Sequence, residues 1–295
     1  MKTIILTLVL LFASLPFTLH AQQFDDIQEK NIDVFLSKEI MEAREMKNIK
    51  LVNSIGITDA QGLIVASPNF IYRIGYYAYQ TRKVKNKTIE SFCVVGSDVY
   101  YASKSKLYKI DTDNVETEVM PLPFSPKVLW AGQELIYAAK SIGKENRLYV
   151  FSPDQKKNKS IFTTESKILC VDELGAIICV LTDKSLVMIN PDKKQYLENP
   201  INTMNMGELK SMAIDKRKGV FYFSSTQGIF RIYNESIQKV CDITGILCYD
   251  LDGMMVFNAE EPYIIRLRNN LLYPPAKGVP IELNHSALKV QRFYK

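Results

Sequence analysis

The stretch SMAIDKRKGVFYFSSTQGIFRIYNES, residues 211 to 236, contains the signals of several β-strands in succession. Runs rich in Val, Ile, Tyr and Phe alternate with the polar turns KRKG and TQ, a pattern typical of antiparallel strands joined by hairpins. In GIFRIY, the alternation of a strand places Ile229, Arg231 and Tyr233 on one face. We therefore expect four strands in this region, in the order LKSMAID, VFYFSS, GIFRIYN and SIQKVCDI.

The central part of this unit recurs along the chain. The six copies are LIVASPNFIYRIG (from Leu63), VYYASKSKLYKID (Val99), LIYAAKSIGKENRLYVF (Leu135), IICVLTDKSLVMIN (Ile177), VFYFSSTQGIFRIY (Val220) and MMVFNAEEPYIIRL (Met254). Their starts are spaced by 36, 36, 42, 43 and 34 residues. This period is typical of propeller blades. The sequence therefore predicts an all-β fold, a six-bladed β-propeller of four-stranded antiparallel blades.

The N-terminal residues 1–21 have the pattern of a secretory signal peptide, with Lys2, an apolar run and a cleavage site near Ala21. Residues 22–47 are expected to form an N-terminal extension, and residues 48–295 the propeller. Either residues 32–37 or residues 287–294 could add the strand that closes the ring, and the pattern does not choose between them. After the leader, no apolar run reaches the roughly 20 residues of a membrane span. We expect a periplasmic or secreted monomer without a transmembrane segment.

The residues KSMAIDKRKGVFYFSSTQGIFRIYNES resemble a blade of the NHL- and YWTD-repeat propellers and of the related gluconolactonase and strictosidine-synthase-like group. In that pattern an inner strand ending in Asp precedes a Gly turn, a Tyr- and Phe-rich strand and a strand of the form G-I-x-R. The resemblance extends over about residues 50–270 at the level of the repeat. It implies a six-bladed propeller and, for the lactonases of the group, carboxylate and amide oxygens around one Ca²⁺. The inner strands of this chain show no clear set of Glu and Asn for such a site.

Charge and cysteine content exclude several other classes of function. The chain has 37 Lys and Arg against 32 Asp and Glu, and its lysines fall in short clusters on the expected outer strands, so no nucleic-acid partner is predicted. The five cysteines lie in apolar runs without a CxxC pair and are expected to pack as small hydrophobic residues. Only Cys241 and Cys248 are close enough in sequence to suggest a local disulfide. His285 is the one histidine after the leader, which excludes a His-rich metal site.

Acidic residues gather at the turn between the first and second strand of the blades. Asp172, Asp215, Asp250 and Asp252 belong to this set. In a propeller such turns meet at one end of the central channel, where the carboxylates could attract Ca²⁺. Asp is also favoured in turns because its side chain accepts hydrogen bonds from its own backbone. We expect the turn role and no cofactor, with a Ca²⁺ site as the alternative.

Binding residues are expected on the loops of the opposite face, because loops carried by a rigid scaffold often bind ligands. The candidates are Phe124, Lys140, Lys144, Arg147, Met204, Met206 and Gln227. Their apolar members could anchor a partner or pack over the channel. A second candidate is a carbohydrate patch in IYRIGYYAYQTRKVK, where Tyr76, Tyr77 and Tyr79 could stack on sugar rings beside Arg82.

These observations favour a non-catalytic binding or scaffold module for an envelope protein or glycan over an enzyme. One alternative is a metal-dependent lactonase or hydrolase of the gluconolactonase type. Another is a periplasmic sensor module. The repeated residues indicate the fold, and the fold alone does not assign a function.

Overall fold

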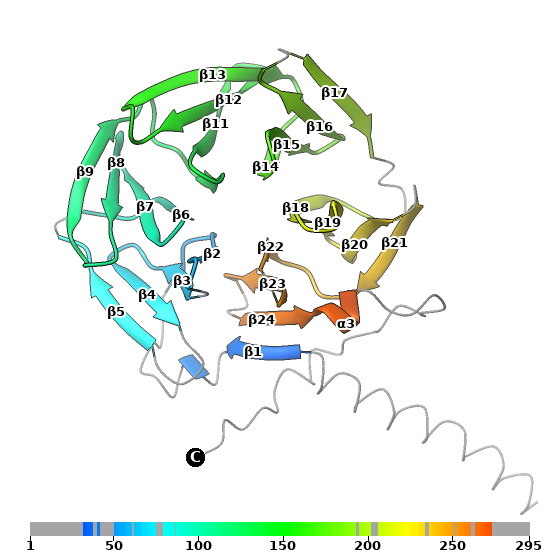
Figure 1. Ribbon diagram of the computed structural model, residues 1–295, viewed down its shortest axis with the longest axis horizontal. Coiled ribbons are helices and arrows are strands. Elements are labelled where there is room, and N and C mark those ends of the chain that lie inside the picture. Colours follow the sequence, from blue (N-terminus) through cyan, green and yellow to red (C-terminus); the bar gives the residue numbers. More distant parts are fainter. Residues whose placement is uncertain are drawn as a thin grey trace, which may run out of the picture.

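The chain forms a ring of six four-stranded antiparallel sheets (Figure 1). The computed structural model describes residues 32–37, 40–41, 50–60, 62–74, 79–85, 87–192, 195–201, 206–233, 236–250, 252–260 and 263–272. The predicted six-bladed β-propeller is therefore confirmed.

The first three blades follow one another along the chain. The first blade contains β2 (Gly56–Ile57), β3 (Leu63–Ala66), β4 (Phe70–Ile74) and β5 (Tyr79–Lys83). The second contains β6 (Ser91–Val95), β7 (Asp98–Ser103), β8 (Lys106–Ile110) and β9 (Glu116–Pro121). The third contains β10 (Trp130–Ala131), β11 (Ile136–Ile142), β12 (Glu145–Ser152) and β13 (Lys157–Thr164).

The last three blades continue in the same order. The fourth contains β14 (Ile168–Leu174), β15 (Ile177–Thr182), β16 (Ser185–Asn190) and β17 (Gln195–Pro200). The fifth contains β18 (Leu209–Asp215), β19 (Val220–Ser225), β20 (Gly228–Tyr233) and β21 (Ser236–Cys241). The sixth contains β22 (Ile246–Tyr249), β23 (Gly253–Asn258), β24 (Tyr263–Arg268) and, as its outer strand, β1 (Ile32–Leu36). A short helix, α3 (Asn269–Leu272), follows β24.

The ring is closed by strands from opposite ends of the chain. β1 pairs antiparallel with β24, with Val34 opposite Ile265, at the lower edge of the ring in Figure 1. Asp33 on β1 forms an ion pair of 2.6 Å with Arg268 on β24. The sixth blade thus contains one strand from the predicted N-terminal extension, residues 22–47, and three strands from the predicted propeller region, residues 48–295. The other candidate for the closing strand, residues 287–294, and the leader lie outside the described residues.

The hydrophobic core lies between the blades. The described residues contain six buried apolar clusters, each shared by two neighbouring blades. In one of them, Leu181 of the fourth blade packs with Ile214 and Phe223 of the fifth. Burying a side chain of this size contributes about 1.5–3 kcal/mol. The stability of the ring therefore depends on every blade having both of its neighbours.

Hydrogen bonds between inner strands supplement this packing. The hydroxyl of Ser54 donates to the carbonyl of Phe92 at 2.9 Å, and the hydroxyl of Ser91 donates to the carbonyl of Pro126 at 2.8 Å. Between the fifth and sixth blades, the backbone N–H of Leu247 donates to the hydroxyl of Ser211 at 3.2 Å. These bonds link neighbouring blades at or next to their inner strands.

Gly228 shows why the third strand of the fifth blade begins with glycine. Its φ is +123°, a conformation that favours glycine. A Cβ atom at this position would lie 2.2 Å from the carbonyl oxygen of Cys241 on β21. The backbone of β20 can thus approach β21 closely only because residue 228 has no side chain.

The cysteines are free thiols in this structure. Cys93, Cys170, Cys179 and Cys241 are buried, and Cys248 is partly exposed. They pack as small apolar residues, and Cys241 is not bridged to Cys248.

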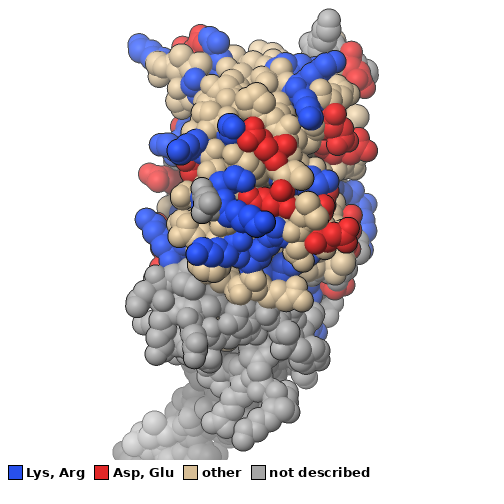
Figure 2. Space-filling model, turned by 90° about the vertical axis from the view of Figure 1, so that its left-hand side faces the viewer, with Lys and Arg blue, Asp and Glu red and all other residues tan. Residues whose placement is uncertain are grey.

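Basic and acidic side chains are intermixed on the side of the ring formed by the first two blades (Figure 2). Lys106 pairs with Glu118 at 2.9 Å, and Lys87 pairs with Glu116 at 2.6 Å. The lysines on this side are therefore partly neutralised by carboxylates of the outer strand β9.

None of the described helices is both long and apolar enough to cross a membrane.

Candidate functional site

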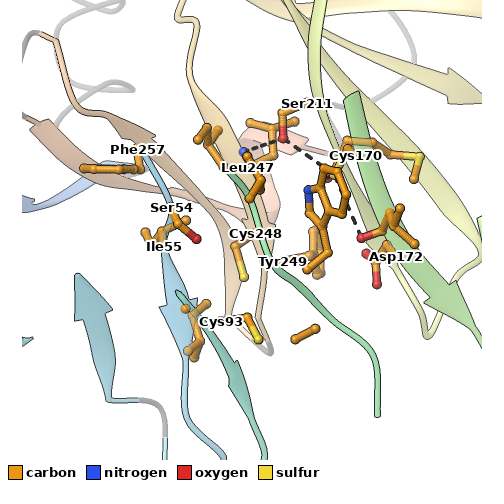
Figure 3. A pocket seen from close by; sticks show the side chains of 18 of the residues that line it. Ser54, Ile55, Cys93, Cys170, Asp172, Ser211, Leu247, Cys248, Tyr249 and Phe257 are labelled. Carbon is orange, nitrogen blue, oxygen red and sulfur yellow. Dashed lines mark hydrogen bonds between the residues drawn. The ribbon is translucent and has the colours of Figure 1, made fainter. Parts of the chain in front are cut away.

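The central channel is a chamber of about 1000 Å³ walled by the inner strands of all six blades. The side chains labelled in Figure 3 converge on it from several blades: Ser54 and Ile55 precede β2, Cys93 comes from β6, and Cys170 and Asp172 come from β14. Because inner strands run in the same direction around a propeller, their starts lie at one mouth of the channel and their ends at the other. The second mouth also carries the turns to the second strands, and we call it the turn-side mouth.

The channel wall contains both apolar and polar residues. Its apolar members include Ile55, Val94, Leu129, Leu169 and Leu247, and Ser54 and Ser211 are among the polar ones. Apolar side chains of this kind predominate in sites that bind small molecules or apolar groups of a partner. The chamber can therefore accept a neutral or apolar group.

Three cysteines, Cys93, Cys170 and Cys248, are among the residues that line the channel. Burial raises the pKa of Cys248 to about 12 and that of Cys170 to about 11. Burial also raises the pKa of Cys93. Only a thiolate is a good nucleophile, so these groups are neutral and unreactive near pH 7. They add polarisable surface to the channel and no charge.

The turn-side mouth carries the acidic residues predicted from the sequence. Asp172 on β14 lies 3.1 Å from the ammonium of Lys216, in the turn after β18. Burial raises the pKa of Asp172, and the charge of Lys216 opposes this effect. This pair joins the fourth and fifth blades at the rim of the channel.

Asp215 and Asp250 have the turn role that the sequence favoured. Asp215 is buried and accepts hydrogen bonds from the backbone N–H of Arg217 at 3.0 Å and from the hydroxyl of Tyr249 at 3.0 Å. Asp250 accepts bonds of 2.8 Å from the backbone N–H of Asp252 and from the guanidinium of Arg266. Both carboxylates thus shape turns and link strands.

The structure brings the four predicted acidic residues to the same mouth on three consecutive blades, but each already has a donor or cation beside it. Asp252 is exposed and lies 3.7 Å from the guanidinium of Arg266. Within the described part of the chain, no three His, Cys, Asp or Glu side chains gather in an arrangement that could hold a metal ion.

Sequence reasoning missed Glu173, which is buried between the third and fourth blades. Its carboxylate accepts hydrogen bonds from the hydroxyl of Tyr137 at 2.5 Å and from the backbone N–H of Gln133 at 2.8 Å. A Cβ atom on Gly132 would lie 2.0 Å from this carboxylate, so glycine makes room for it. The sequence contained one signal of this residue: the apolar run ILCV is followed by two consecutive acidic residues, Asp172 and Glu173. Its role is to join two blades beside the turn-side mouth.

The loop residues predicted to bind a partner do not gather into one site within the described part of the chain. Phe124 is buried and packs against Tyr149 at 5.1 Å between ring centroids, with the ammonium of Lys140 over its ring at 5.5 Å. Met206 is buried in the cluster between the fourth and fifth blades. Phe124 and Met206 are therefore core residues, because the cavities between blades need apolar side chains to fill them.

The remaining candidates are spread over the surface or lie outside the described residues. Lys144 and Gln227 are exposed, and Arg147 pairs with Glu145 at 2.9 Å. Met204, Tyr76 and Tyr77 fall outside the described residues, as does the side chain of Tyr79. Arg82 lies on β5 and donates a hydrogen bond to the carbonyl of Asn114.

Comparisons with known proteins support the fold. No protein-family model matches the chain, and no curated protein is similar to it in sequence. Among solved structures, a protein of unknown function from Bacteroides thetaiotaomicron is similar with a TM-score of 0.59 and 12% identity, over 81% of this chain and 75% of that one. The structure of a nidogen/laminin complex is similar with a TM-score of 0.54 and 11% identity, over 67% of this chain and 85% of that one.

A third similar structure is the extracellular domain of a protein from B. thetaiotaomicron designated a one-component system. It has a TM-score of 0.51 and 12% identity over 80% of this chain. The chain spans 40% of the length of that domain. At 11–12% identity these likenesses show the propeller fold alone, and the resemblance to the gluconolactonase group stays a prediction.

Proposed function

We propose that this protein is an exported, non-catalytic binding module that receives an apolar part of an envelope partner in its central channel. The observation that carries the proposal is the chamber of about 1000 Å³, whose wall contains apolar residues such as Leu169 and whose turn-side mouth carries Asp172 and Lys216. Such a chamber suits a neutral group whose polar ends remain at the mouths. The partner is a protein of the cell envelope that inserts a loop or chain end, and a glycan is the alternative.

Two further features support binding over chemistry. The thiols of the channel are held neutral by burial, so they offer no nucleophile at neutral pH. The carboxylates Asp215 and Asp250 are occupied by turn and inter-blade hydrogen bonds. The similarity to an extracellular domain of a one-component system makes a sensor role a related possibility, in which the same channel would receive the signal.

The proposal is tested by placing a charge in the channel. Leu169→Asp introduces a carboxylate into the apolar wall, and Ala131→Trp narrows the chamber without adding charge; both residues line the channel. Leu197→Asp is the matched control, because Leu197 is 57% exposed on the outer strand β17. Immobilised wild-type protein and the L197D variant are expected to retain the same envelope component, which is then purified and titrated. The L169D and A131W variants are expected to bind it at least 10-fold more weakly.

Circular dichroism melting establishes which variants are folded. If a folded L169D or A131W variant binds the purified partner as tightly as the wild-type protein, the channel is not the recognition site.

The lactonase alternative is tested by a calcium titration followed by thermal melting, since a ligand that binds only the folded state raises the melting temperature. A rise of several degrees that is lost in the Asp172→Asn variant would favour a Ca²⁺ site at the turn-side mouth. Asp172 is chosen because it faces the channel beside Lys216, whereas Asp215 is part of a turn.

A further inference from the structure

A second cavity of about 270 Å³ lies between the first and second blades, away from the central channel. Arg73 stands opposite Gln80 in the pairing of β4 with β5, and Ile71 stands opposite Arg82. Residues that are directly opposite, or two apart along a strand, share one face of a sheet, so these four line one wall. Val99 and Ile110, which pair with each other in the second blade, form an apolar wall. The pocket therefore combines two guanidinium groups with an apolar surface.

Among the described residues, none accepts a hydrogen bond from one buried nitrogen of Arg73, the Nη2 atom. A buried donor without a partner destabilises the folded state, and it does so more strongly when the group is charged. Most buried donors in proteins are satisfied, so an exception of this kind points to an acceptor supplied from outside the chain.

The repeat shows which acceptor this position takes. Four blades have a cationic residue three positions after the first residue of the third strand, and we call it the repeated cation position. Its members are Arg73 after Phe70, Lys109 after Lys106, Arg231 after Gly228 and Arg266 after Tyr263.

At three of these positions a protein oxygen meets the cation. Lys109 lies 2.6 Å from a carboxylate oxygen of Asp98. Arg231 donates to the backbone carbonyl of Leu272 at 2.5 Å, and Arg266 donates to a carboxylate oxygen of Asp250 at 2.8 Å. At Arg73 the pocket lies beside the guanidinium.

Carboxylates near this pocket have other partners. The Oδ1 atom of Asp111 accepts a hydrogen bond from the backbone N–H of Val115 at 2.7 Å. Glu116 accepts from Lys87 at 2.6 Å and from the hydroxyl of Tyr101 at 2.9 Å. These carboxylates are thereby held in bonds that do not involve Arg73.

We propose that this inter-blade pocket binds an oxyanion group of a small molecule, with Arg73 and Arg82 as its cationic contacts. Guanidinium groups bind carboxylate, sulfate and phosphate through pairs of parallel hydrogen bonds, which makes them suited to this ligand chemistry. The cavity is slightly smaller than the roughly 300–1000 Å³ of sites for drug-sized ligands. The carrier of the oxyanion is therefore no larger than about one sugar ring, which would lie against Val99 and Ile110.

The proposal is tested by isothermal titration calorimetry on the whole protein at constant ionic strength. The probes are inorganic sulfate, glucuronate as an oxyanion on a sugar ring, and glucose as the neutral control. Sulfate and glucuronate are expected to bind and glucose is not, and tighter binding of glucuronate than of sulfate would assign a role to the apolar wall. Arg73→Gln and Arg82→Gln are each expected to weaken binding at least 10-fold, because each removes one cationic contact.

Lys83→Gln is the matched control, since it removes one positive charge from the same strand. Lys83 is exposed and lies on the face of β5 opposite to that of Arg82. The K83Q variant is expected to bind the oxyanion within twofold of the wild-type affinity. If it weakens binding as much as the arginine substitutions do, the anion is held by diffuse surface charge and the proposal is wrong.

Two other results would overturn the proposal: no binding of either oxyanion to the wild-type protein, or folded arginine variants that bind as tightly as the wild type. Should R73Q fail to fold, R82Q decides the outcome, because Arg82 is only partly buried. The L169D variant is expected to bind the oxyanion like the wild type. Failure of the channel proposal is thereby distinguished from failure of this one.

Discussion

The interface between the first and second blades differs from that between the fifth and sixth at one equivalent residue. The third strands FIYRI and GIFRI both have arginine in fourth place, opposite a glutamine of the outer strand: Arg73 faces Gln80, and Arg231 faces Gln238. Arg231 is 8% exposed and donates to Gln238 and to the carbonyl of Leu272 in α3. Arg73 has a buried nitrogen without an acceptor among the described residues and faces a pocket.

One residue of a repeat can therefore support the fold in one blade and line a proposed binding pocket in another. The role of the arginine in each blade depends on the segment that follows or flanks that blade. The helix α3, after the sixth blade, places a carbonyl oxygen against Arg231. The four cations of the repeated cation position have different partners, so replacing each of them is expected to lower the free energy of unfolding by a different amount.

Arg266→Met is expected to have the largest effect, a loss of about 3–5 kcal/mol in the free energy of unfolding. Arg266 and Asp250 are both nearly inaccessible, with side-chain exposures of 6% and 4%, so the substitution leaves a buried carboxylate without its cation. Urea denaturation measures the change. The double variant R266M/D250N should recover part of the loss, and a loss below about 1 kcal/mol would contradict the assigned role.

Arg231→Met is expected to cost about 2 kcal/mol, because its partners are neutral. The carbonyl of Leu272 and the amide oxygen of Gln238 would each lose a donor. The same denaturation experiment measures the effect. A Gln238→Met variant serves as a control, since it removes one acceptor and leaves the bond to Leu272 in place. If Arg231→Met lowers the free energy of unfolding as much as Arg266→Met does, the buried charged partner of Arg266 does not make that site more important for stability.

Lys109→Met is expected to cost less than about 1 kcal/mol, because the ion pair with Asp98 is partly exposed to solvent. The hydrogen bond to Asp98 raises the pKa of Lys109 above its ordinary value of 10.5. Because the pKa of Lys109 is higher in the folded protein, its ion pair with Asp98 stabilises the fold fully at pH values below 10.5. This stabilisation is lost as the pH rises through the pKa of the folded state.

Thermal melting of the wild type and of the K109M variant between pH 8 and about pH 11.5 measures this effect. The difference between the two proteins should shrink as the pH rises. A difference that grows with pH would show that the sign of the linkage is wrong.

Arg73→Met is expected to have the smallest effect, a change of less than about 1 kcal/mol in the free energy of unfolding. Removing a buried donor without an acceptor relieves a penalty, and this offsets the lost packing of the side chain. Urea denaturation in a buffer without sulfate or phosphate measures it. A loss as large as that of Arg231→Met would indicate that Arg73 already has a structural partner, which would weaken the proposal of an oxyanion pocket.

Much of the fold could be predicted from the sequence because its signals are local. In the fifth blade, LKSMAID and VFYFSS correspond to β18 and β19 residue for residue, and the outer two strands end within two residues of the predicted limits. Strand alternation and turn residues act over a few positions, so they can be recognised without knowing the neighbours. The choice of residues 32–36 as the closing strand could not be made in this way, since it depends on pairing with β24 at the other end of the chain.

The candidate site was predicted less completely. The turn positions of Asp215 and Asp250 followed from the repeat, whereas Phe124 and Met206 looked like loop residues and are core residues. Glu173 was missed because its partners Tyr137 and Gln133 belong to the preceding blade. Burial and hydrogen bonding between blades depend on residues some 40 positions apart, and no local pattern records them.

Hydrophobic alternation and turn chemistry repeat with the blade, so the sequence alone indicates six blades, the order of strands in the first five of them and a cation in four third strands. The partner of each of those cations depends on the folded arrangement of the blades. Asp98, Leu272 and Asp250 supply an oxygen to three of them, and the pocket between the first and second blades lies beside Arg73. A charged group forms its hydrogen bonds and ion pairs with the groups that lie around it in the folded protein. In a ring of similar blades, these groups differ where the strands have different neighbours.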